Sequence, residues 1–198
     1  MLIVAHRGAS WDHPENTLEA FDAAIADGAD WIELDVRADV DGRLVVTHDP
    51  PRGRGLEPTL EQALDLCRGR IGVMVELKTP ARYRRHDVIG RTLRLVGDDD
   101  AIVCFQRPAL VEVRRRRPGL RTVQHVGFGV SIRGADGAWA VGFHDPRVNV
   151  RGIQAAHARG FETLVYTVNT QKRVRDLARL GVDGIFTDRP ALARDTLT

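Results

Sequence analysis

Glu33 and Asp35 stand at alternate positions of a β-rich stretch, WIELDVRADVDGRLVVTHD, which covers residues 31–49. Residues two apart on a strand share a face, so these two carboxylates should lie side by side. Like charges repel each other, and a carboxylate is costly to bury without a partner. The spacing therefore predicts that a positive group lies against both acids.

The same alternation recurs in the segment VMVELK, where Glu76 and Lys78 share a face. Two histidines also close strand-like segments: His6 ends the first of them, directly before Arg7, and His48 ends a later one. In α/β barrel enzymes the carboxyl ends of the strands carry the chemistry. These polar residues are therefore expected to converge at one mouth of a barrel.

Three carboxylates from two strands need positive charge between them, and a divalent cation supplies it. Mg²⁺ and Ca²⁺ bind carboxylate, water and phosphate oxygens, whereas zinc prefers nitrogen and sulfur ligands. The alternative is that Arg7, Arg37 or Lys78 neutralises the acids in salt bridges. The third carboxylate and the two histidines favour one divalent cation, Mg²⁺ or Ca²⁺, over this alternative.

His6 and His48 have ordinary pKa values near ~6.5, which suits proton exchange at neutral pH. A histidine at the end of a strand is often structural, but each of these borders a polar loop. Arg7, which follows His6, can bind a phosphate in bidentate fashion. Two histidines, an arginine, a lysine and a metal cage together indicate phosphoryl transfer.

Short apolar runs alternate with amphipathic stretches along most of the chain. The predicted strands are Leu2–Ala5, Trp31–Val36, Val73–Lys78, Ala101–Phe105, Arg121–Val126, Ala138–Phe143, Glu162–Val168 and Gly184–Thr187, with an extra strand at Leu44–His48. The predicted helices are Thr17–Asp27, Thr59–Arg68, Asp87–Val96, Pro108–Arg116, Val150–Arg159 and Gln171–Leu180. This alternation favours an α/β fold, a compact (β/α)₈ TIM barrel, over an open doubly wound sheet. We expect a single domain over residues 1–198.

Composition narrows the class of protein. A net charge of +2 does not indicate a nucleic-acid-binding protein, and no apolar run approaches the ~20 residues of a transmembrane helix. Cys67 and Cys104 form no disulfide or zinc motif, which fits a reducing compartment, so we expect a cytoplasmic protein. Four arginines at 114–117 indicate a solvated helix face, with anionic lipid or nucleic acid as the alternative partner.

The chain resembles the glycerophosphodiester phosphodiesterase family. The resemblance lies in AHRG at 5–8, PENT at 14–17, ELDV at 33–36, DGRLVVTHD at 41–49, VELK at 75–78, YTVN at 166–169 and GVDGIFTDRP at 181–190. Any one of these motifs is weakly specific, but together they run in the family's order across nearly the whole chain.

The resemblance implies a (β/α)₈ barrel that hydrolyses a glycerophosphodiester to glycerol phosphate and an alcohol, with Mg²⁺ or Ca²⁺. By position, Glu33, Asp35 and Glu76 match the metal ligands. His6 and His48 match the general acid/base pair. Arg7 and Lys78 match the cations that contact phosphate.

The chain also departs from the family's pattern. Members usually carry a longer segment after the second histidine, whereas here PPRGRGLEPTLEQ leads quickly into a helix, which predicts a more open pocket. Tyr166 stands where tryptophan is common, and CFQ at 104–106 replaces a serine–phenylalanine pair. Tyr166 and Phe105 either form the glycerol side of the pocket, as substrate-binding residues, or belong to the core.

Three other functions are alternatives to hydrolysis of a small soluble diester. The first is a lipid-directed phosphodiesterase of lysophospholipase D type with an open site. The second is a non-catalytic phosphodiester-binding protein, which has little need for two proton-transfer groups. A barrel glycosidase that uses Glu33 and Glu76 ranks lower because it explains neither histidine.

Four further residues are expected near the site. Glu15 and Asn16 of PENT are interpreted as groups that fix the loop before a helix. Asn169 and Asp188 follow predicted strands and either order loops or contact ligand.

Overall fold

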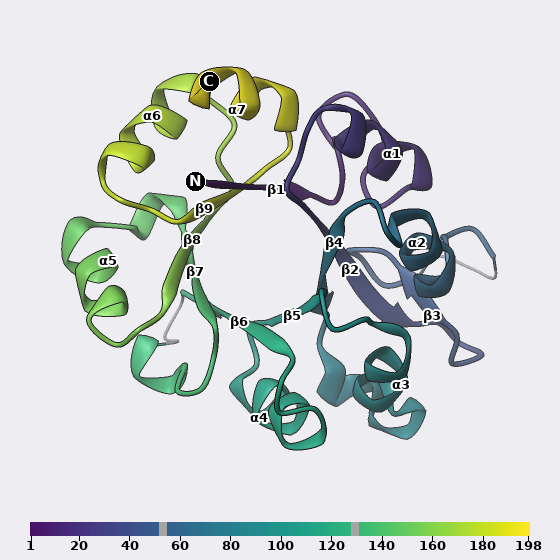
Figure 1. Ribbon diagram of the computed structural model, residues 1–198. Coiled ribbons are helices and arrows are strands. Elements are labelled where there is room, and N and C mark those ends of the chain that lie inside the picture. Colours follow the sequence, from purple (N-terminus) through teal and green to yellow (C-terminus); the bar gives the residue numbers. More distant parts are fainter. Residues whose placement is uncertain (52–54, 128–130) are drawn as a thin grey trace.

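The structure, a computed structural model, describes residues 1–51, 55–127 and 131–198, and its strands form a closed ring (Figure 1). Eight parallel strands make the ring: β1 (Leu2–His6), β2 (Trp31–Ala38), β4 (Gly72–Leu77), β5 (Ala101–Cys104), β6 (Arg121–Val126), β7 (Ala140–His144), β8 (Glu162–Tyr166) and β9 (Gly184–Thr187). β1 pairs with both β2 and β9, which closes the barrel. The predicted (β/α)₈ fold is confirmed, and the open sheet is excluded.

Helices surround the ring on its outside (Figure 1). They are α1 (Leu18–Ala26), α2 (Leu60–Cys67), α3 (Val88–Leu95), α4 (Arg107–Arg116), α5 (Val150–His157), α6 (Gln171–Arg179) and α7 (Pro190–Leu197). The 3₁₀ segments are η1 (Pro80–His86), η2 (Ile132–Gly134) and η3 (Asp145–Arg147). The predicted capping box of α2 is present, since Thr59 and Gln62 bond to each other's backbone.

Several boundaries differ from the predicted ones. β3 (Leu44–Val46) is antiparallel to β2 and stops two residues before His48. The Thr47 amide still donates to the Asp35 carbonyl, but the Asp35 amide donates to Asn16 Oδ1 and returns no bond to Thr47. β8 ends at Tyr166 rather than Val168. η1 and α7 were not predicted, although Pro190 at the first position of α7 is a typical helix-start residue.

The side chains inside the barrel form an apolar layer below a polar one. Nine buried residues make the apolar layer: Val4, Trp31, Met74, Ala101, Val103, Val123, Ala140, Leu164 and Phe186. Two residues further along β2 and β4, the same parity points Glu33 and Glu76 inward. Ile32 and Leu34, of opposite parity, pack outward in the core beneath the helices, as predicted. The polar residues are therefore held at the mouth by the layer beneath them.

Candidate active site

Three buried carboxylates meet near the carboxyl ends of β2 and β4. Glu33, Asp35 and Glu76 are 1%, 0% and 6% exposed, and one oxygen from each lies within 4.8 Å of the others. Strand register explains this meeting, since Asp35 pairs with Glu76 and Glu33 pairs with His6 of β1. We call these three carboxylates the acid cluster.

Two cations contact the acid cluster. Lys78 Nζ lies 3.0 Å from Asp35 Oδ1 and 2.8 Å from Glu76 Oε1, and Arg7 Nε lies 3.1 Å from Asp35 Oδ2. The salt bridges considered as the alternative to a metal therefore form at two of the three acids. Glu33 Oε1, by contrast, is buried without a hydrogen-bond partner among the described residues.

The charges within the cluster are only partly compensated. Burial raises the pKa of Glu33 well above its usual range, and the neighbouring Asp35 and Glu76 raise it further. Burial also raises the pKa of Glu76 against the opposing effect of Lys78. For Asp35, Lys78 and Arg7 outweigh burial and hold the pKa below its ordinary value. Oxygen donors with excess negative charge fit a divalent cation, so the acid cluster could hold one.

Arg37, the third cation considered for neutralisation, is engaged elsewhere. Its Nε donates to the His48 carbonyl at 2.8 Å and its Nη1 donates to Thr79 Oγ1 at 3.2 Å. His48 itself lies in the loop after β3, with its side chain 39% exposed and Nδ1 3.0 Å from Asp49 Oδ1. Arg37 therefore holds the His48 loop rather than the acids.

His6 is oriented by a chain of hydrogen bonds from the last strand. Its Nδ1 lies 2.7 Å from Asp188 Oδ1, and Asp188 Oδ2 accepts from Asn169 Nδ2 at 2.5 Å. Ser10 Oγ donates to the same Asp188 oxygen at 3.1 Å. When Nδ1 carries the proton and donates it in the hydrogen bond to Asp188, a neutral His6 ring presents Nε2 as a proton acceptor. Asp188 and Asn169 therefore orient His6, and contact with a ligand, the other role considered for them, stays a prediction.

The PENT loop also contacts the acid cluster. Asn16 Nδ2 donates to Asp35 Oδ2 at 2.9 Å, and the Asp35 amide donates to Asn16 Oδ1 at 3.2 Å. Asn16 has φ of 61°, a conformation that asparagine tolerates better than most residues. Glu15 Oε2 accepts from Arg7 Nη1 at 2.7 Å. Both residues fix this loop, as predicted, and they fix it directly onto site residues.

Aromatic rings form the other side of the mouth. Phe105, which is 38% exposed, and Tyr166 meet edge-on with ring centroids 5.9 Å apart. His125 of β6 lies against both, with centroids 4.8 Å from Phe105 and 4.4 Å from Tyr166. The Phe105 side chain is accessible from solvent at this side of the mouth, and its role as a substrate-binding residue stays a prediction.

His125 was missed by sequence reasoning. Its signal was its parity, since it lies two residues after the interior Val123 at the end of a strand. Burial lowers its pKa to about 3, helped by the charges of Lys78 and His6, so the ring is neutral. A Cβ on Gly142 would lie 2.1 Å from His125 Nδ1, so the absence of a side chain on β7 makes room for the imidazole.

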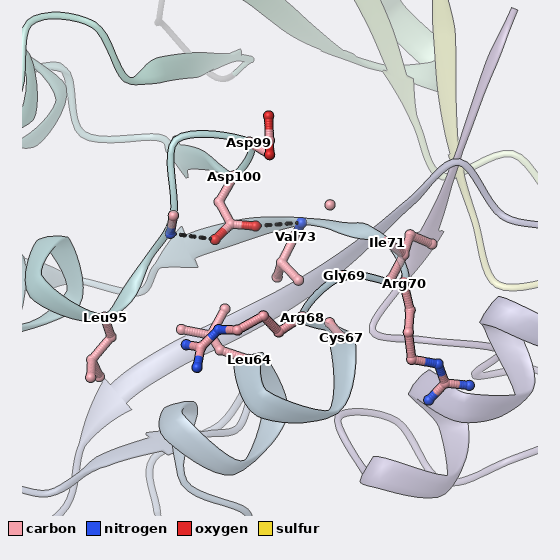
Figure 2. Close-up of a pocket in the computed structure, with 12 residues that line it drawn as sticks. Leu64, Cys67, Arg68, Gly69, Arg70, Ile71, Val73, Leu95, Asp99 and Asp100 are labelled. Atoms are coloured by element: carbon pink, nitrogen blue, oxygen red, sulfur yellow. Dashed lines mark hydrogen bonds between the residues drawn. The ribbon is translucent and has the colours of Figure 1, made fainter.

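Two cavities lie at opposite ends of the barrel. One of about 400 Å³ at the mouth is lined by His6, Arg7, Ser10, Trp11, Glu15 and Asp188. Another of about 460 Å³ lies at the amino-terminal ends of β4 and β5, where Asp100 accepts hydrogen bonds from the Val73 and Gly97 amides (Figure 2). Barrel enzymes bind substrate at the carboxyl ends of the strands, so we assign the site to the mouth despite the larger volume elsewhere.

The comparison with known proteins agrees with the motifs. A sequence model of the Glycerophosphoryl diester phosphodiesterase family matches residues 6–78 and 58–192. The chain belongs to this family. YhdW of Bacillus subtilis is 32% identical over 96% of this chain and 95% of the relative. A glycerophosphodiester phosphodiesterase of Bacillus altitudinis is 28% identical, over 95% of this chain and 94% of the relative.

The fold is shared with a phosphodiesterase of Oleispira antarctica, solved in complex with the product sn-glycerol-3-phosphate. The TM-score is 0.87 at 22% identity, over 100% of this chain and 96% of that one. Family membership identifies the chain as a phosphoric diester hydrolase, which removes the glycosidase alternative.

The chain is more compact than its relatives. The match to YhdW spans 231 aligned positions, more than the 198 residues present here, so the relative contains segments without a counterpart. The segment PPRGRGLEPTLEQ, from which a more open pocket was predicted, includes residues 52–54, which lie outside the described residues, so that openness stays a prediction. Within the described ranges, no helix has the length and apolar character to cross a bilayer.

Proposed function

We propose that the enzyme hydrolyses glycerophosphodiesters to glycerol 3-phosphate and an alcohol, and that it depends on a divalent cation. The observation that carries the proposal is the buried acid cluster beside the His6–Asp188 pair. The Oleispira phosphodiesterase, with the same fold, was solved with sn-glycerol-3-phosphate, which supports this product class.

The acid cluster would hold the metal through Glu33, Asp35 and Glu76. The unpartnered Glu33 oxygen supports this assignment, since a buried carboxylate oxygen is costly without a partner. When bound, Mg²⁺ or Ca²⁺ would act as a Lewis acid on phosphoryl oxygens. Which of the two cations is native is left open.

The two histidines would move the protons. His6, with Nδ1 held by Asp188, exchanges a proton at Nε2, and His48 serves as its partner from the β3 loop. One of them removes the proton of the nucleophile, which is water or a hydroxyl of the substrate. The other protonates the oxygen of the leaving alcohol.

Charge and shape would position the diester. Arg7 and Lys78 place two positive charges beside the acid cluster, where they can contact phosphate oxygens. The exposed edge of Phe105 and the ring of Tyr166 would line the glycerol side. Phe105 has no ionisable group, and the Tyr166 hydroxyl stays neutral because burial raises its pKa to about 12.

The test is to incubate the purified enzyme with glycerophosphocholine and Mg²⁺ or Ca²⁺ and to assay glycerol 3-phosphate. We expect product in the presence of metal and its loss in excess chelator. Full turnover in chelator would contradict the metal requirement. Tight binding of the diester without any product would instead favour the non-catalytic binding protein.

A lipid-directed activity of lysophospholipase D type is the second candidate. The exposed Phe105 favours it, because an apolar ring at the mouth can contact an acyl chain. Assaying choline release from lysophosphatidylcholine beside the soluble diester separates the two. Faster turnover of the lysophospholipid would replace our first proposal.

We also propose that the chain acts as one domain in the cytoplasm. The supporting observation is that Cys67 and Cys104 are both buried as free thiols, in keeping with a reducing compartment. Fractionation of the native host with an antibody to the enzyme would test the location.

A further inference from the structure

Three arginines of η1 are exposed beside the catalytic mouth. η1 follows directly on β4, the strand that leads to Glu76 and Lys78, so it lies in a connection at the carboxyl end of the barrel. Arg82, Arg84 and Arg85 are all exposed. None of the three forms an ion pair with a described residue, and Arg85 only donates from Nε to His86 Nε2 at 2.9 Å.

The arginine run at 114–117 is the instructive contrast. Arg115 and Arg116 both pair with Glu112, Arg117 pairs with Asp98, and Arg114 donates to Thr122. This is the structural helix face that the sequence indicated. The uncompensated positive charge therefore lies at η1 and not on the longer arginine run.

Apolar side chains are exposed in the same set of connections. Among described residues, the three most exposed large apolar side chains are Leu56 (74%), Val40 (70%) and Trp11 (57%). Val40 and Leu56 lie between β2 and α2, and Trp11 lies between β1 and α1. Trp11 and Val40 follow the carboxyl ends of β1 and β2, so these two apolar side chains lie at the same end of the barrel as the mouth, and Leu56 follows β3.

Val40 and the arginines belong to one continuous surface. A groove of about 280 Å³ is lined by Val40, Pro50 and Pro51 together with Arg82 and Arg85. Its one acidic residue, Asp39, is buried and paired with Arg43. The turn that follows Val40 packs on η1, since a Cβ on Gly42 would lie 2.6 Å from His86 Nδ1. We call Val40, Pro50, Arg82, Arg84 and Arg85 the mouth patch.

We propose that the mouth patch docks the enzyme on the surface of a bilayer that contains anionic phospholipids. Unpaired arginines attract an anionic surface, and exposed apolar tips insert at its headgroup boundary. The phosphates of a nucleic acid could pair with the arginines, but they offer no apolar surface against which Val40 and Leu56 could be buried. Docking goes beyond the proposed hydrolysis, and it turns the active-site mouth toward lipid headgroups.

The test is co-sedimentation with phosphatidylcholine vesicles that contain or lack phosphatidylglycerol. We expect the wild type to bind only the anionic vesicles, and the Arg82→Gln/Arg84→Gln/Arg85→Gln variant to bind them at least tenfold more weakly, at roughly fivefold per arginine. The Val40→Ser/Leu56→Ser variant should also lose binding. Turnover of soluble glycerophosphocholine should be unchanged in both.

The matched control is Arg68→Gln/Arg94→Gln/Arg179→Gln, which removes the same charge from exposed arginines at the ends of helices on the opposite face. It should bind vesicles like the wild type. Equal weakening by both triple variants, or equal binding to neutral and anionic vesicles, would overturn the proposal. So would arginine-dependent binding of duplex DNA without vesicle binding. None of these readouts requires catalysis, so docking fails or holds independently of the proposed function.

Discussion

The mouth of the barrel has a charged half and an aromatic half that are built in different ways. The charged half lies on β1, β2 and β4 and contains His6, Glu33, Asp35, Glu76 and Lys78. The aromatic half lies around β5, β6, β8 and β9 and contains Phe105, His125, Tyr166 and Phe186. Strand register assembles the first half, and ring packing assembles the second.

The two halves also differ in how burial is compensated. In the charged half, buried acids keep cations within ion-pair distance and still leave Glu33 Oε1 unpartnered. In the aromatic half, the buried His125 ring is neutral, because burial lowers its pKa to about 3, and so it needs no charged partner. The comparison suggests that the charged half performs the chemistry while the aromatic half shapes the site without adding charge.

The largest expected effect is on turnover, from the histidines of the charged half. His6→Ala and His48→Ala should each lower kcat by at least ~10²-fold, because each removes a proton-transfer group. Measured with glycerophosphocholine, the loss should not be accompanied by a loss of metal-induced thermal stabilisation. His125→Phe is the matched control from the aromatic half, and it should retain most of kcat. Equal losses in all three variants would erase the distinction between the halves.

Metal binding should stabilise the folded protein through the acid cluster of the charged half. Saturating Mg²⁺ or Ca²⁺ at one hundred times its Kd should add about 2.7 kcal/mol to the unfolding free energy, seen as a rise in Tm. Glu33→Gln should abolish most of that rise, since it removes a ligand of the acid cluster. Glu15→Gln, a carboxamide at the same mouth but outside the cluster, should keep it. An unchanged Tm response in Glu33→Gln would refute the ligand assignment.

In the aromatic half, by contrast, added side-chain volume should lower the stability of the protein. Gly142→Ala places a Cβ against the His125 ring and should cost about 1–3 kcal/mol of stability through overpacking. The double variant Gly142→Ala/His125→Ala should cost less than the sum of its single changes, because the clash is gone. Urea unfolding measures all four proteins of this cycle. Simple additivity would show that the two residues do not press on each other.

The smallest expected effect is the pH dependence of stability at Asp188. Burial alone would raise its pKa, but His6 and Asn169 outweigh burial and hold that pKa below its ordinary value. Such a carboxylate stabilises the fold above its unfolded pKa of about 3.9, and the contribution is lost as the pH falls through the lower folded value. Below about pH 4, the wild type should therefore lose unfolding free energy more steeply than Asp188→Asn. The measurement is urea unfolding at a series of pH values. If the unfolding free energies of the wild type and Asp188→Asn fall equally steeply below about pH 4, this linkage is wrong.

The sequence predicted the charged half well because alternation along one strand is local information. Glu33, Asp35 and Glu76 could be placed on inward faces from parity alone, and the family resemblance supplied their order in the chain. The partner of His6 could not be found in this way, since Asp188 is 182 residues away and reaches it only when β1 pairs with β9. His125 was missed because its role depends on Gly142 of the next strand.

The predicted bounds of helices and strands were wrong where tertiary contacts override the local preference of the sequence for a helix or strand. The LVVTH segment is apolar and β-branched, yet β3 stops at Val46, because the Asp35 amide of β2 donates to Asn16 Oδ1 instead of to Thr47. η1 contains three arginines and no helical apolar period, and it is held in part by the packing of His86 on Gly42. Neither contact is visible in a linear pattern.

The seam between the first and last strands has a consequence for synthesis. The three carboxylates and Lys78 all lie within residues 33–78, whereas Asp188, which orients His6, is added to the growing chain only 110 residues after Lys78. A chain that stops before Asp188 lacks the carboxylate that aligns the His6 imidazole. Alignment of this ring therefore waits for β9 to pair with β1.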